Sequence, residues 1–146
     1  MKSPKAKASG KQLYLYISSD KPLKDSSTIR AEIVAYALQF IGNPYKWGGI
    51  SLTKGTDCSG FTQSVFKDHG ISIPRTSKAQ AAAGRNISLD SRKPGDLIFY
   101  RKYGTINHVA LYIGNDKVIS AGSLSTGIRI TEYNYREPYK VVSYID

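Results

Sequence analysis

The order of secondary-structure signals along the 146-residue chain predicts an α+β domain, with N-terminal helices packed against a five- to six-stranded antiparallel sheet. Apolar residues recur every three to four positions in the first half of the chain, which is typical of helices. After Pro94-Gly95 the apolar period becomes two, which is typical of strands. Helices that precede strands favour this class over alternating βαβ units.

The breaking and capping residues predict where each element begins and ends. Three helices are expected. The first runs from near Thr28 to Gly42, the second from Asp57 or Cys58 to Gly70, and the third from the cap Ser77 to Gly84. Ser26 and Ser27 are the expected caps of the first helix. Residues 44–56 are glycine-rich, have no regular period and are predicted to form a structured loop. Five strands are expected at residues 97–100, 108–113, 118–121, 128–133 and 141–145.

Charge and composition predict one basic domain behind a basic lead-in. Residues 1–30 contain seven Lys/Arg and two Asp, so they carry +5 of the net charge of +10. We therefore expect residues 1–27 to be a flexible lead-in or linker and residues 28–146 to be the domain. Anionic wall polymers are a candidate partner of the lead-in. No arginine cluster with interleaved aromatics indicates nucleic-acid binding, and no apolar stretch is long enough to span a membrane.

The only cysteine, Cys58, is the candidate nucleophile. It falls in the predicted first turn of the second helix, where the peptide dipoles favour a thiolate, so we expect the pKa of its thiol to be lowered. One cysteine and two histidines do not make a zinc site, and neither a metal nor another cofactor is predicted. The alternative is a buried structural thiol.

A cysteine nucleophile needs a base, and His108 is the better of the two histidines. It opens a predicted strand, from which an imidazole can face a helix N-terminus. His69 lies at a predicted helix C-terminus and is expected to be structural. If residues 114–116 form a three-residue hairpin loop, Ile113 pairs with Lys117, and Ser120 lies on the same face as His108.

Five sequence blocks, in this order and with similar spacing, resemble the NlpC/P60 family of cell-wall cysteine peptidases. The resemblance covers residues 29–145, and the blocks are Asn43-Pro44-Tyr45-Lys46-Trp47-Gly48-Gly49, Asp57-Cys58-Ser59-Gly60-Phe61, Pro74-Arg75-Thr76-Ser77, Pro94-Gly95-Asp96-Leu97 and His108-Val109-Ala110-Leu111-Tyr112-Ile113-Gly114. It implies a papain-like fold and hydrolysis of the γ-D-glutamyl bond to a diamino acid in peptidoglycan stem peptides. A secreted or wall-associated location follows from that substrate, although MKSPKAKASGKQ lacks the apolar core of a secretion signal.

The resemblance also implies roles for particular residues. Cys58 would be the nucleophile and His108 the base, while Tyr45 and the pair Asp57 and Ser59 would border the substrate cleft. Tyr45 would help to position the substrate or stabilise the oxyanion. Asp57 suits both a helix cap and a contact with a substrate amine.

At two further positions, Trp47 and Ser120, the resemblance leaves more than one role open. Trp47 is a candidate substrate contact or a packing residue beside its two glycines. Twelve positions after the base, the family commonly has His, Asn or Gln, and this chain has Ser120. A hydroxyl orients an imidazole less firmly than those side chains, and Asn107 or a water are other candidates for that task. A wall-binding domain with weak or no activity, or an N-acetylmuramoyl-L-alanine amidase, is therefore the alternative function.

Overall fold

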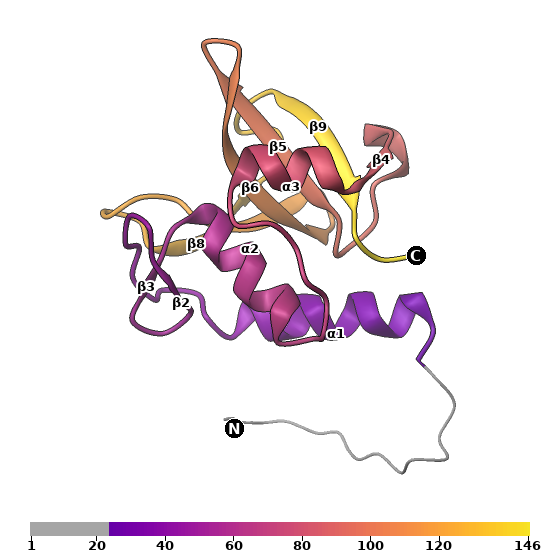
Figure 1. The fold of residues 1–146 in the computed structure, drawn as a ribbon, viewed down its shortest axis with the longest axis horizontal. Helices are drawn as coiled ribbons and strands as arrows, with labels where there is room; N and C mark the ends of the chain where they lie inside the picture. Colours follow the sequence, from indigo (N-terminus) through magenta and orange to yellow (C-terminus); the bar gives the residue numbers. More distant parts are fainter. Residues whose placement is uncertain (1–23) are drawn as a thin grey trace.

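The computed structural model describes residues 24–146, in which helices in the first half of the chain pack on an antiparallel sheet formed by the second half (Figure 1). The predicted α+β class is confirmed. The predicted lead-in falls mostly on residues 1–23, outside the described residues. Its last positions belong to the domain, because the first helix begins at Ser26.

The three α-helices begin and end close to their predicted positions. They are α1 (Ser26–Leu38), α2 (Cys58–Lys67) and α3 (Ser77–Ala83). The side chain of Asp25 accepts the N–H of Thr28 and caps α1, so the predicted serine caps are wrong. Thr76 caps α3 in place of the predicted Ser77. Carboxylates and threonine hydroxyls compete with serine for such positions, so the cap itself is hard to predict.

The sheet has six strands in the order β4-β9-β5-β6-β7-β8, with every neighbouring pair antiparallel. The strands are β4 (Arg85–Ile87), β5 (Leu97–Lys102), β6 (Thr105–Gly114), β7 (Lys117–Ala121), β8 (Ile128–Glu132) and β9 (Pro138–Ser143), and a 3₁₀ turn, η1 (Leu89–Ser91), follows β4. The loop before α2 contains a small hairpin of β2 (Ile50–Ser51) and β3 (Gly55–Thr56). Neither this hairpin nor β4 was predicted, because two- or three-residue strands are too short to show a period.

The core lies on both faces of the sheet. On one face, Phe99, Leu111 and other strand residues pack against buried residues of α1 and α2, such as Ile33 and Phe61. On the other face, a second cluster gathers around Tyr100. Burial on both sides explains why the first predicted strand is a continuous apolar run rather than an alternating one. No helix among residues 24–146 has the length and apolar character needed to cross a bilayer.

A buried ion pair joins α1 to the turn before β5. Arg30 and Asp96 are 7% and 1% exposed, and Arg30 Nη1 lies 2.7 Å from Asp96 Oδ1. Arg30 also donates to the carbonyl of Pro94, and its Nη2 donates to Ser143 Oγ and to the carbonyl of Ile145. The guanidinium therefore fixes α1, the turn before β5 and the C-terminal segment relative to one another.

Replacing Arg30 by Met is expected to lower the free energy of unfolding by about 3–5 kcal/mol, because Asp96 would keep a buried charge without its partner. Urea unfolding followed by circular dichroism measures the loss. Adding Asp96→Asn should recover part of it, since the orphaned charge is then removed. An effect no larger than that of Lys67→Met, at an exposed position of α2, would show that the pair contributes little.

Candidate active site

The N-terminus of α2 presents the only cysteine. Asp57 has the extended backbone of a cap (φ −89°, ψ −177°), and its Oδ1 accepts the N–H of Gly60 at 2.7 Å. The helix therefore begins at Cys58, as predicted. Its thiol is half-buried in the first turn and lies near the backbone N–H of Val109, the residue that follows His108 on β6.

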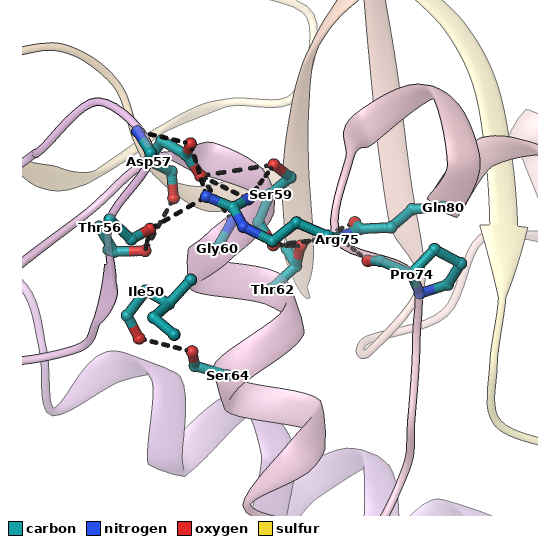
Figure 2. Close-up of polar contacts among 12 residues, drawn as sticks. Ile50, Thr56, Asp57, Ser59, Gly60, Thr62, Ser64, Pro74, Arg75 and Gln80 are labelled. Atoms are coloured by element: carbon teal, nitrogen blue, oxygen red, sulfur yellow. Dashed lines mark hydrogen bonds and ion pairs between the residues drawn. The ribbon is translucent and has the colours of Figure 1, made fainter.

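A network of charged hydrogen bonds fixes the cap, as Figure 2 shows. Arg75 donates through Nη1 to Asp57 Oδ1 at 3.0 Å and through Nη2 to Asp57 Oδ2 at 2.9 Å. The same Nη1 donates to Ser59 Oγ at 2.8 Å, and Gly48 N donates to Asp57 Oδ2 at 3.1 Å. Burial opposes ionisation, but the hydrogen bonds from Arg75 and Gly60 outweigh it and hold the pKa of Asp57 below its usual value.

Arg75 was not predicted as a site residue, although it stands in one of the five blocks. The motif that contains Arg75 was therefore recognised in the sequence, but nothing in the sequence showed that its side chain reaches the N-terminus of α2. Ser59, expected at the cleft border, is buried and spends its hydroxyl on Arg75 and Asp57. In this structure Ser59 therefore helps to hold the Asp57 carboxylate in place, through its hydrogen bonds to Asp57 and Arg75.

The thiol of Cys58 has a raised pKa, so the predicted lowering is wrong. Burial is the largest cause, and the negative charge of Asp57 adds to it. The N–H groups of Val109, Ser59 and Cys58 itself act in the opposite direction and do not compensate. Position at a helix N-terminus favours a thiolate only where the thiol is not desolvated at the same time.

His108 and Ser120 form the hydrogen bond that the predicted geometry allows. Both residues are buried, and His108 Nε2 lies 3.1 Å from Ser120 Oγ. Asn107, the other protein candidate for orienting the imidazole, instead accepts from Arg136 Nη2 at 2.6 Å through its side-chain oxygen.

The hairpin that brings Ser120 to His108 differs from the predicted one. Its loop has two residues, Asn115 and Asp116, with φ of 57° and 62°, and Gly114 pairs with Lys117. A register shift between Tyr112 and Gly114 absorbs the extra residue. Beyond this shift the pairing is the one expected, so the wrong loop length leaves Ser120 on the correct face.

The imidazole of His108 is neutral at physiological pH. Burial lowers its pKa from 6.5 to about 4, and the positive charges of Arg136 and Arg129 add to the effect. The ring also lies beside Tyr100, with ring centres 5.9 Å apart. The resting pair is therefore a neutral thiol and a neutral imidazole.

Two tyrosines lie near the thiol of Cys58. The pKa of Tyr45 is raised chiefly by burial and, to a smaller extent, by the charges of Cys58 and Asp57. The hydroxyl of Tyr45 therefore lies close to both residues. Tyr135, in the turn between β8 and β9, has its pKa raised by burial, and Cys58 contributes. Tyr135 was missed because no motif marks that turn. Trp47 is 83% exposed and therefore does not pack in the core.

The second histidine lies at the other end of α2. His69 Nδ1 is 2.8 Å from the carbonyl oxygen of Val65, and its ring packs edge-on against Tyr36 with centres 5.0 Å apart. These contacts agree with the predicted structural role. Among residues 24–146 no group of three or more acidic, histidine or cysteine side chains gathers where it could hold a metal ion.

Comparison with known proteins identifies relatives of the chain. It is 41% identical over 112 residues to the γ-D-glutamyl-L-lysine dipeptidyl-peptidase of Bacillus subtilis, covering 75% of this chain and 38% of that protein. It is 47% identical over 89 residues to the probable endopeptidase p60 of Listeria innocua, covering 61% of this chain and 19% of that protein. The chain thus spans well under half the length of these curated relatives.

A solved structure supports the same relationship and the papain-like α+β fold. An NlpC/P60 family protein from Bacillus cereus superposes with a TM-score of 0.77 at 32% identity, covering 86% of this chain and 42% of that one. The NlpC/P60 family itself matches residues 42–144, which include Tyr45, Cys58, His108 and Ser120. With fold, motif order and family match in agreement, the chain belongs to the NlpC/P60 family.

Proposed function

We propose that this chain is a cysteine endopeptidase that cleaves the bond between γ-D-glutamate and the diamino acid in peptidoglycan stem peptides, in a secreted or wall-associated setting. The observation that carries the proposal is the position of the Cys58 thiol, in the first turn of α2 and beside the strand on which His108 is hydrogen-bonded to Ser120. The names of the relatives, which include a γ-D-glutamyl-L-lysine dipeptidyl-peptidase, support this bond as the target.

The neutral resting pair sets the order of events. In the tautomer that carries its proton on Nε2, His108 donates to Ser120 Oγ, and Nδ1 is left to accept the proton of Cys58. Because the pKa of the thiol is raised and that of the imidazole is lowered, proton transfer accompanies attack on the carbonyl and does not precede it. The sulfur forms a bond to the γ-glutamyl carbonyl carbon, and the N–H groups of Cys58 and Ser59, which face the thiol, stabilise the oxyanion.

The remaining steps return the enzyme to its starting state. The imidazolium of His108 donates its proton to the diamino acid amine, the C–N bond breaks, and a thioester remains on Cys58. Water then attacks the thioester carbonyl with His108 as base, and the C–S bond breaks. The D-glutamyl product leaves with a free γ-carboxyl group, and the proton held by His108 returns to the sulfur of Cys58. Tyr45, Trp47 and Asp57 border the acyl side, where the carboxylate of Asp57 attracts a substrate amine.

Replacing Cys58 by Ala is expected to lower kcat by at least about 10³-fold, because the thioester can no longer form. Hydrolysis of a purified stem peptide, followed by mass spectrometry, measures this loss and identifies the bond that is cut. His108→Gln should be similarly impaired and His69→Gln should not. A Cys58→Ala protein as active as the parent would disprove the mechanism, and release of the peptide from the sugar would indicate an amidase.

Replacing Ser120 by Ala is expected to lower kcat/KM by roughly tenfold, the effect of removing the partner of a functional histidine. Ser120→Asn supplies an amide oxygen that can accept from Nε2 and should restore part of the activity. Melting temperatures separate this effect from unfolding, because Ser120 is buried. Equal kcat/KM in the parent and the alanine variant would show that Ser120 does not orient the imidazole.

Activity should persist under mildly acidic conditions. His108 acts as a base only while neutral, and its pKa is lowered from 6.5 to about 4, so the neutral form survives as the pH falls through this window. The acid limb of kcat/KM is therefore expected near pH 4, measured only where circular dichroism shows the folded protein. A limb centred near 6.5 would contradict the buried, neutral imidazole.

A second function, wall binding without hydrolysis, is favoured by the raised pKa of the Cys58 thiol. The two functions are separated by the Cys58→Ala protein. An endopeptidase loses product formation while it still binds stem peptides, whereas a binding domain forms no product in either protein.

A further inference from the structure

Two arginines flank His108 on the part of the site formed by β8 and the turn that follows it. Arg136 Nη2 donates to Asn107 Oδ1 at 2.6 Å and to the carbonyl of Arg101 at 2.9 Å. Its guanidinium lies 5.6 Å from the centre of the Tyr100 ring, which in turn packs against His108. Arg136 is therefore held beside the imidazole by the residue that precedes His108 in the chain.

Arg129 reaches the same place from β8. It is paired directly with Ser120 across the β7–β8 ladder, and directly paired residues project their side chains from the same face of a sheet. A Cβ on Gly122 would lie 3.3 Å from Arg129 Nε, so the side chain passes over Gly122. The exposed Arg129 thus stands on the face that carries the bond between His108 and Ser120.

Neither arginine is neutralised by a carboxylate within residues 24–146. The acidic group of the site, Asp57, is already bound by Arg75, and Glu132 on β8 pairs with Lys117. The guanidinium of Arg129 also makes no hydrogen bond within this part of the chain. Both positive charges act on His108, and each lowers its pKa. Two uncompensated guanidinium groups beside a reaction centre are suited to bind a carboxylate, for which the arginine fork is shaped.

The mechanism indicates which part of the substrate meets these charges. The imidazole that protonates the leaving amine must lie next to the residue that carries this amine. Arg129 and Arg136 adjoin the imidazole, whereas Asp57 and Arg75 adjoin the start of α2. The arginines are therefore assigned to the leaving diamino acid and Asp57 to the acyl side.

We infer that Arg129 and Arg136 bind a carboxylate of the leaving residue, and that the chain therefore prefers diaminopimelate to lysine. The side chain of diaminopimelate ends in a carboxylate as well as an amine, whereas lysine ends in an ammonium that two arginines repel. This inference rests on the proposed function, since it names the diamino acid for the same reaction.

The test uses four stem peptides of the form L-Ala-γ-D-Glu-X-D-Ala, each closed by a C-terminal amide. X is diaminopimelate, lysine, or diaminopimelate with an amidated side-chain carboxyl; the fourth peptide keeps diaminopimelate and amidates the α-carboxyl of D-glutamate. For the parent chain, kcat/KM should be roughly tenfold higher for diaminopimelate than for lysine, the value of one charge-assisted hydrogen bond. Amidation of the side-chain carboxyl should lower kcat/KM to the lysine level.

Arginine variants assign the preference to the two guanidinium groups. Arg129→Gln and Arg136→Gln should each reduce the diaminopimelate-to-lysine ratio, whereas Arg136→Lys should retain part of it. Lys67→Gln removes one exposed charge at the far end of α2 and controls for net charge. The side chain of Arg129 has no hydrogen-bond partner in residues 24–146, so its variant reports on binding without disturbing the hairpin that Arg136 supports.

The outcomes separate this inference from the proposed function. A ratio unchanged in both glutamine variants overturns the inference, as does a preference that disappears only when the D-glutamyl carboxyl is amidated. Calorimetric titration of the Cys58→Ala protein with the same peptides measures the preference without turnover. If the Cys58→Ala protein binds the diaminopimelate peptide more tightly and the parent cleaves no peptide, the carboxylate-binding site is supported. The same result rejects the proposed endopeptidase activity.

Discussion

The carboxylate of Asp57 is the interaction on which the geometry of the site depends. It caps α2 through Gly60, accepts two hydrogen bonds from Arg75 and one from the backbone of Gly48. One carboxylate thereby holds three segments together. They are the helix that carries Cys58, the loop before this helix, which contains Gly48, and the segment after it, which contains Arg75. Charge-assisted hydrogen bonds of this kind are stronger than neutral ones, so the first turn of α2 is rigid before a substrate arrives.

This rigidity matters because neither reacting group is activated at rest. Burial raises the pKa of Cys58 and lowers that of His108, so in the proposed mechanism the thiolate and imidazolium form only together, as the carbonyl is attacked. Rate enhancement must then come from placement and from the N–H groups aimed at the oxyanion. A desolvated thiol also resists adventitious alkylation and oxidation, because less of it is present as the reactive thiolate.

The sequence predicted those parts of the fold and site that depend on local pattern. The start of α2 at Cys58 follows from its cap, and the approach of Ser120 to His108 follows from the period of two and from hairpin register, even though the loop length was wrong. Arg75 and Tyr135 were missed because each reaches the site through loop paths that only the packed chain defines. The raised pKa of Cys58 was missed because burial is a property of the whole fold.

Glycines at the contact between α2 and the preceding loop restrict how this site can change. A Cβ on Gly60 would collide with the carbonyl oxygen of Gly49, and one on Gly49 would collide with the carbonyl of Gly55. The two backbones touch without intervening side chains, so the loop and the helix behave as one piece. Transplanting the nucleophile into another scaffold would require both segments together, and in a mutational library variation should be tolerated around this piece but not within it.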